Sequence, residues 1–119
     1  MEYEMMFEVT NRYTAKELGS GTLNVLGTPG LIAMVENVCM NAIEKDLESG
    51  YTSVGSSIDI NHMRPSIMGA LIKIVVMMKE SDGKSYHFTY KAYDQDKVIA
   101  TGKHTRVKVN TMTFMERIK

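Results

Sequence analysis

The sequence has only one cysteine, Cys39, among its 119 residues. A lone cysteine cannot form an internal disulfide, which is typical of proteins in the reducing cytoplasm. The spacings CxxC and HExxH, which often hold zinc, are also missing. We therefore expect a cytoplasmic protein that uses neither a bound metal nor another cofactor.

Long apolar runs and an excess of one charge are absent as well. The longest apolar run, Ile74–Met78, is far too short to cross a bilayer, and Met1–Arg12 is acidic and alternating, unlike a signal peptide. Basic and acidic residues number 14 each, so no nucleic-acid partner is indicated. The length of 119 residues suits one domain, 1–119, small enough to favour a partner subunit.

The central element of the sequence is a helix predicted over residues 27–47. Thr28 suits the N-cap, and Pro29 suits the first helical position, where its missing N–H costs nothing. A helical period places the apolar stripe at Leu31, Val35, Val38 and Ala42. Glu36 falls inside the apolar flank of this helix, where a carboxylate is costly unless it is paired, hydrogen-bonded or used in function.

Strand-like patterns flank this helix. Alternating or apolar runs predict strands at residues 3–9, 53–62, 70–78, 85–92 and 98–110. Asp82-Gly83 predicts a hairpin turn, and Gly102 suggests a bulge. We expect an α+β fold in which one strand and the helix precede a four-strand antiparallel meander. Because one helix covers only one face of a sheet, the two-sided apolar segment 71–78 predicts a dimer.

Three side chains are predicted to converge between helix and sheet. In the predicted strand 53–62, His62 shares its parity with Val54, Ile58 and Ile60, so it should point towards the helix that carries Thr28 and Glu36. An imidazole, a carboxylate and a hydroxyl can together move protons and activate water. Structural roles also explain each residue: a helix cap for Thr28, a half-buried histidine near a strand end, and a buried ion pair of Glu36 with Arg64 or Arg106.

Four pieces of the sequence together resemble hot-dog-fold thioesterases, in particular the fluoroacetyl-CoA-specific thioesterases. They are Thr28-Pro29, the V-E-x-x-C-M run from Val35, S-V-G-S-S-I-D-I-N-H over 53–62, and T-G-K-H-T-R-V-K-V-N over 101–110. The resemblance implies a five-stranded antiparallel sheet wrapped around one long helix, with two subunits paired through their sheets. It also implies metal-free hydrolysis of an acyl-CoA to a carboxylate and CoA.

The family's site residues fall on five positions of this sequence. Thr28 matches the nucleophile or water-positioning hydroxyl, His62 the general base and acid, and Glu36 the partner of the histidine or the water activator. Gly55 and Arg106 match positions that line the family's substrate site. The resemblance leaves two roles open for Arg106, which would either contact the phosphates of CoA or hold the active-site network.

One segment departs from the family. The fluoroacetyl enzyme has an aromatic-bearing lid between its first strand and its helix, whereas residues 13–27 contain Tyr13 as their only aromatic residue. We therefore expect some other short or medium acyl-CoA as the substrate. The alternative is a non-catalytic acyl-CoA-binding protein with the same pocket. A hydratase matches less well, because Asp59 and His62 poorly replace the Asp–His signature of those relatives.

Overall fold

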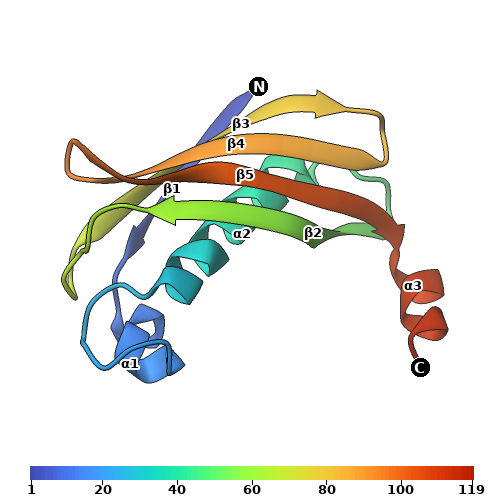
Figure 1. Cartoon of the computed structure of the whole chain (residues 1–119). Coiled ribbons are helices and arrows are strands. Elements are labelled where there is room, and N and C mark those ends of the chain that lie inside the picture. Colours follow the sequence, from blue (N-terminus) through green and yellow to red (C-terminus); the bar gives the residue numbers. More distant parts are fainter.

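A computed structural model describes all 119 residues and contains one antiparallel sheet with a long helix against one face (Figure 1). The strands are β1 (Glu2–Glu8), β2 (Tyr51–His62), β3 (Leu71–Ser81), β4 (Ser85–Asp94) and β5 (Lys97–Asn110). The helices are α1 (Ala15–Leu18), α2 (Thr28–Glu44) and α3 (Thr111–Arg117), and a short 3-10 helix, η1, covers Asn11–Tyr13. The predicted α+β class, with five antiparallel strands around one long helix, is confirmed.

The strand order β1-β3-β4-β5-β2 corrects the predicted four-strand meander. Only β3, β4 and β5 are sequential neighbours, while β2 lies at the far edge beside β5. The start of α2 lies beside β2, where Thr28 contacts His62, and its later part lies beside β1, where Asn41 contacts Met5. The 17 residues of α2 extend about 25 Å, and five strands at about 4.8 Å spacing measure about 19 Å, so the helix runs between the two edge strands of the sheet.

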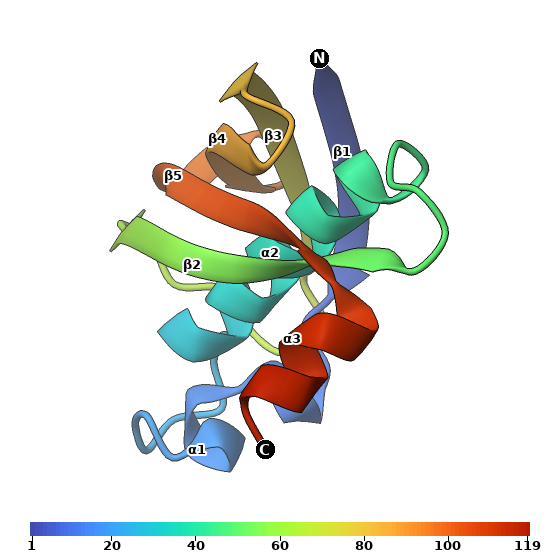
Figure 2. The same cartoon turned by 90° about the vertical axis from the view of Figure 1, so that its right-hand side faces the viewer.

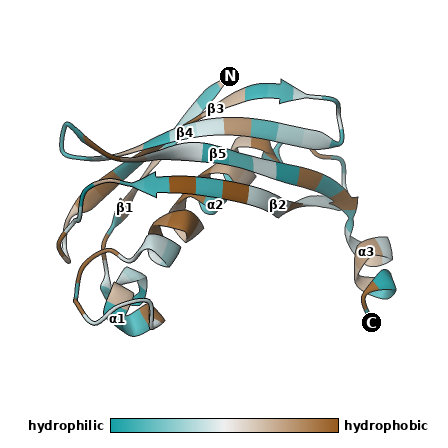
Figure 3. Ribbon diagram, in the orientation of Figure 1, coloured by the Kyte–Doolittle hydropathy of each residue, from teal (hydrophilic) through white to brown (hydrophobic).

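The apolar stripe of α2 forms the centre of the core, as predicted. Its fully buried members are Leu31, Met34, Val35, Val38, Cys39 and Ile43. They pack against the inward side chains of β3 and β4, which are Ile72, Ile74, Val76, Tyr86, Phe88, Tyr90 and Ala92. The alternation along β2 is visible as brown and teal bands in Figure 3. The period-2 strands and the period-3.6 helix therefore bury their apolar residues against each other.

A β-bulge lies at Ser56 in β2, where the sequence did not predict one. Gly55 pairs with Arg106 and Ser57 pairs with Thr105, so Ser56 is the extra residue. An extra residue switches the alternation of a strand from one face to the other. The inward face of β2 therefore changes parity at this point.

This change of parity corrects the predicted face of Val54. Val54 pairs with Val107 on the outer face, whereas Gly55, the partner of the buried Arg106, points inward. Beyond the bulge the inward residues are even-numbered, as predicted for Ile58 and His62. The bulge thus allows Gly55 and His62 to face the same helix.

Gly102 is not a bulge, and its role is close packing. The pairing of Gly102 with Ile60 and Tyr90 continues without a shift. A β-carbon at position 102 would collide with the backbone oxygen of Asp59 and the hydroxyl of Tyr90. These two atoms form a hydrogen bond of 2.5 Å across the sheet, so the glycine leaves room for it.

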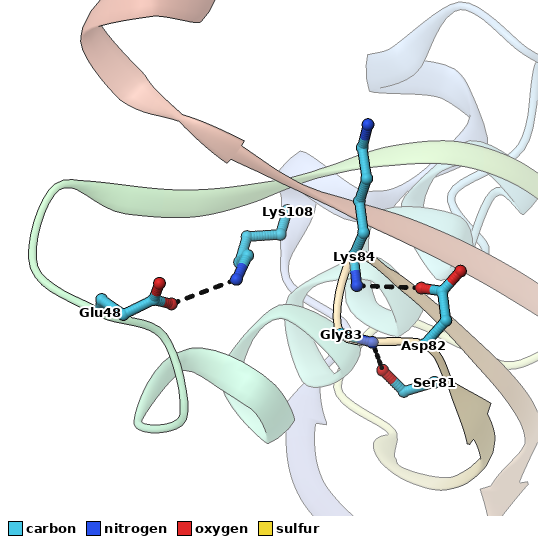
Figure 4. Close-up of polar contacts among 6 residues, drawn as sticks. All are labelled: Glu48, Ser81, Asp82, Gly83, Lys84 and Lys108. Carbon is cyan, nitrogen blue, oxygen red and sulfur yellow. Dashed lines mark hydrogen bonds and ion pairs between the residues drawn. The ribbon is translucent and has the colours of Figure 1, made fainter.

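The β3–β4 connection confirms the predicted Asp-Gly turn (Figure 4). The carboxylate of Asp82 accepts hydrogen bonds from the backbone N–H groups of Lys84 and Ser85, at 2.9 and 2.7 Å. The Ser81 hydroxyl accepts from the N–H of Gly83, which has a φ of +86° that favours glycine. Local side-chain bonds therefore determine this hairpin.

The C-terminal helix α3 was not predicted. The side chain of Asn110 caps it by accepting from the N–H of Thr113. The helix projects from the end of β5 (Figure 2), and Met112 and Ile118 are 83% and 62% exposed. No helix in the structure has the length and apolar character that a membrane span requires.

Replacing Gly102 with alanine should destabilise the fold by about 2 kcal/mol, because the added methyl group must displace a backbone oxygen and a tyrosine ring. Chemical denaturation measures the change in the free energy of unfolding. Lys103→Ala, at the exposed neighbouring position, is the control and should change stability little. Equal stability of the two variants would show that the sheet accommodates a side chain at position 102.

Candidate active site

The first half of the site joins the start of α2 to the end of β2. The N-cap of α2 is Gly27, and no side chain caps this end, so the predicted capping role of Thr28 is wrong. Thr28 is instead the first helical residue, and its Oγ1 lies 2.9 Å from Nδ1 of His62. The predicted approach of Thr28 and His62 is therefore present within one chain.

His62 is placed to act as a base. The residue is half-buried, and its Nε2 is buried without a hydrogen-bond partner. Burial lowers the pKa of His62, while the backbone of Arg64 opposes part of this effect. The neutral imidazole is therefore favoured near neutral pH, and its Nδ1 can accept the proton of the Thr28 hydroxyl.

A cavity of about 340 Å³ lies beside this pair. Its walls are residues 62–65 on one side, and Ala15, Ser20 and 25–28 on the other. The segment between β1 and α2 thus forms one wall of the cavity with small and aliphatic side chains. Such a cavity suits a small apolar group held next to a polar reacting centre.

The second half of the site places Glu36 against the backbone of Gly55. A β-carbon at position 55 would lie 2.5 Å from Glu36 Oε2 and 3.2 Å from His104 Cε1, so any larger residue there would displace the Glu36 carboxylate. The Glu36 carboxylate forms no ion pair, since the two ion pairs of the chain are Lys108–Glu48 and Lys119–Glu116. The alternative of a structural ion pair with an arginine is therefore wrong for this chain, and the carboxylate can contact water or a ligand.

Arg106 and His104 form a buried polar network behind Glu36. Arg106 donates from Nε to Ser53 Oγ at 2.8 Å and from Nη2 to the Ser53 carbonyl at 3.0 Å. Its Nη1 lies 3.2 Å from His104 Nε2, and His104 Nδ1 lies 2.8 Å from the Ser57 carbonyl. Since the arginine can only donate, His104 accepts at Nε2 and donates from Nδ1, and is therefore neutral.

These contacts hold the bulge from both sides. Arg106 is bonded to Ser53 before the bulge, and His104 is bonded to Ser57 after it. Burial lowers the pKa of Arg106, while the nearby Glu36 opposes this effect. Only 6% of Arg106 is exposed, so its guanidinium serves the network rather than an external phosphate.

His104 is a site residue that the sequence did not reveal. In the sequence no carboxylate lies near His104 at the spacing of a metal-binding or catalytic pair. Its contact with the bulge forms only because β5 lies beside β2. The chain contains no group of three or more histidine, cysteine, aspartate or glutamate side chains arranged to hold a metal ion. Burial raises the pKa of Cys39 to about 12, which makes its thiol a poor nucleophile.

The two halves of the site are separate within one chain. Thr28 and Glu36 lie eight residues apart on α2, which corresponds to about 12 Å along the helix axis. Thr28 contacts His62 at one end of β2, while Glu36 contacts Gly55 before the bulge. The predicted convergence of all three groups is thus not produced by a single copy.

Comparisons with known proteins agree with this architecture. The family described as fluoroacetyl-CoA-specific thioesterase matches residues 9–112. A fluoroacetyl-CoA thioesterase from Streptantibioticus cattleyicolor is 22% identical over 95 residues, which cover 80% of this chain and 68% of that protein.

Two solved structures show the same fold. The fluoroacetyl-CoA thioesterase FlK has a TM-score of 0.94 at 20% identity, over 99% of this chain and 92% of that one. A hot-dog-like protein from Thermanaerovibrio acidaminovorans has a TM-score of 0.89 at 20% identity, over 99% and 87%. The hot-dog fold is therefore confirmed.

Because His62 and His104 are held neutral in the folded chain, we expect the free energy of unfolding to decrease in acid. Burial lowers the pKa of both His62 and His104 from the ordinary value of 6.5. Below that pH these two histidines bind more protons in the unfolded chain than in the folded chain. The free energy of unfolding should therefore decrease as the pH falls below about 6.5. Denaturation curves between pH 5 and 8 measure this dependence.

The variant His104→Asn should weaken the pH dependence, because an amide can still donate to the Ser57 carbonyl but does not titrate. His87→Asn, which changes an exposed imidazole, is the matched control. An identical slope in the His104 variant and the native protein would contradict the assignment of a neutral, buried His104.

Proposed function

The chain belongs to the family of fluoroacetyl-CoA-specific thioesterases, and we propose that it hydrolyses a short or medium acyl-CoA to a carboxylate and free CoA. Thioester hydrolysis is the activity that the family name describes. The observation that carries the proposal is the contact of 2.9 Å between Thr28 Oγ1 and His62 Nδ1 at the wall of a cavity. We assign this activity to residues 1–119 as one domain.

In the proposed mechanism, Thr28 and His62 act in the first step. Thr28 Oγ1 attacks the thioester carbonyl carbon while its proton passes to His62 Nδ1. Free N–H groups in the first turn of α2 can stabilise the oxyanion. When the C–S bond breaks, the sulfur of CoA takes the proton from His62.

Glu36 acts in the second step. Its carboxylate accepts a proton from a water molecule that attacks the ester on Thr28, and the acid is released as the threonine hydroxyl recovers its proton. Gly55 supports this role because its missing side chain keeps the Glu36 carboxylate close to the bulge. Arg106 supports it by holding Ser53 and His104 behind that carboxylate.

A dimer formed through β2 would bring the two halves of the site together. β2 is a 12-residue edge strand that pairs only with β5, and a free edge of this length favours pairing with another strand. A twofold axis makes two such strands antiparallel, with the Gly55 end of one beside the His62 end of the other. Glu36 from one copy then approaches Thr28 and His62 from the second copy.

The substrate class follows from the cavity wall. Val25, Leu26 and Ala15 present aliphatic surface near Thr28, and residues 13–27 contain no phenylalanine. These side chains suit a substrate with an aliphatic acyl group. The segment has no phenylalanine with which an aromatic lid could select a fluorinated group. One relative was crystallised with fluoroacetate and CoA, which supports CoA as the carrier of the acyl group here.

The cellular location and remaining partners are proposed on the same basis. We propose that the chain binds CoA thioesters as substrates and a second copy of itself as its protein partner. Cys39 is buried as a free thiol, which is compatible with a reducing cytoplasm. We propose no cofactor, because the groups named above account for both proton transfers.

Each of the substitutions Thr28→Ala, Glu36→Gln and His62→Gln should lower kcat for acyl-CoA hydrolysis at least about a hundredfold, since each removes a group that attacks or transfers a proton. Release of free CoA from a panel of straight-chain acyl-CoAs measures the rates and identifies the preferred length. Glu44→Gln and His87→Gln are matched controls at exposed positions.

Near-normal rates in the three site variants would contradict the assigned residues. Tight binding of acyl-CoA without release of CoA by the native protein would instead establish the non-catalytic binder. Mass spectrometry of the Glu36→Gln variant after mixing with substrate should detect an acyl group on Thr28. Its absence, together with an active Thr28→Ala variant, would show direct attack by water.

Mixing the Glu36→Gln and His62→Gln variants tests whether the site is shared between two copies. If subunits exchange freely, half of the dimers are mixed, and each mixed dimer has one intact site, so about a quarter of the native activity should return. Light scattering measures the dimer mass in parallel. An inactive mixture of fully exchanged dimers would show that each site is formed within one chain.

A further inference from the structure

A large groove lies next to the catalytic cavity and has no role in the mechanism above. It has a volume of about 1050 Å³ and is formed by residues 64, 65 and 67–71, by Met6 and Lys73, and by residues 94, 95, 97 and 99 around the β4–β5 turn. Figure 1 shows the end of β2, the segment that follows it and the β4–β5 turn at the same end of the sheet. The groove therefore lies at the end of the sheet that carries His62.

The groove carries a net positive charge. Arg64, Lys73 and Lys97 line it, and Asp94 is its one acidic residue. None of these four residues takes part in either ion pair of the chain. Lys73 lies 5.0 Å from the ring of Tyr93, which orients its ammonium group without cancelling the charge. The groove thus has a net charge of about +2, suited to a multiply charged anion.

The floor of the groove is apolar and exposed. Ile67, Leu71, Met6 and Met68 are 73%, 57%, 55% and 41% exposed, and all line it. Exposed apolar residues gathered in one place indicate a binding surface more often than scattered ones do. A ligand that matches both features has a flat, weakly polar ring system joined to several phosphates.

The groove and the catalytic cavity share two wall residues. Arg64 and Pro65 line both, and Arg64 follows His62 by only two residues. Leu71 and Lys73 of the groove lie on the outer face of the sheet, and Thr28 and His62 lie on the α2 face. One elongated ligand therefore reaches both sites by passing over Arg64 and Pro65 at the end of the sheet, with its reactive end at His62 and its charged end in the groove. Arg106 cannot serve the charged end, because its guanidinium is buried and bonded to Ser53 and His104.

We propose that this groove binds the nucleotide end of the acyl-CoA substrate, with the adenine on the apolar floor and the phosphates near Arg64, Lys73 and Lys97. This inference rests on the proposed function, because it requires a CoA thioester as the substrate. It separates two tasks in space: the cavity at Thr28 holds the acyl group, and the groove holds the carrier.

The experiment compares two substrates with the same acyl group, an acyl-CoA and the corresponding acyl-pantetheine, which lacks the nucleotide. The double variant Lys73→Ala/Lys97→Ala should lower the preference for acyl-CoA, expressed as the ratio of the two kcat/KM values, about tenfold, because two charge contacts at the surface are lost. Lys91→Ala, on the outer face of β4, is the matched control and should leave the ratio unchanged.

Calorimetric titration with CoA itself makes the test independent of hydrolysis. CoA should bind the double variant about tenfold more weakly than the native protein, and dephospho-CoA should show a smaller difference. An unchanged substrate ratio and unchanged CoA affinity in the double variant would overturn the groove assignment even if hydrolysis is normal. If neither thioester is hydrolysed but the variant still binds CoA more weakly, the groove assignment stands and the proposed hydrolysis is wrong.

Discussion

The contact of the Glu36 carboxylate with the backbone of Gly55 is the constraint on which the rest of the site depends. It depends on the missing side chain at Gly55, since a β-carbon there would displace the carboxylate, on a bulge that turns the glycine inward, and on polar groups that hold the bulge. Arg106 and His104 meet the last requirement through Ser53 and Ser57. A half-buried carboxylate without an ion pair is costly, and proteins usually keep such groups where they serve a function.

The same sheet organises both ends of the substrate path. The free edge of β2 carries Gly55 and His62 at separate points, so Glu36 and the Thr28–His62 pair lie apart within one chain, and the proposed dimer would bring them together. Beyond His62, the segment through Arg64 turns towards the charged groove. In the proposed function, acyl binding, hydrolysis and carrier binding thus follow the course of one strand and the loop after it.

The local sequence pattern was sufficient to predict the buried residues wherever burial alternates regularly along an element. The apolar stripe of α2, the inward residues of β3 and β4, and the Asp82-Gly83 turn all follow from periodicity and side-chain chemistry. Three of the wrong predictions share one origin. The face of Val54, the role of Gly102 and the four-strand meander each depend on which strands are neighbours, and periodicity within a strand does not contain that information.

The sequence by itself determined the α+β class, the five strands and long helix, and the residues Thr28, Glu36 and His62 as the chemically distinctive groups. It did so because amphipathic periods and misplaced polar residues are local properties. Only the tertiary structure decided that Thr28 bonds to His62 rather than capping its helix, and that His104 and Arg106 hold the bulge behind Glu36. These contacts join residues 34 to 53 positions apart or depend on the β2–β5 register, and folding alone brings such residues together.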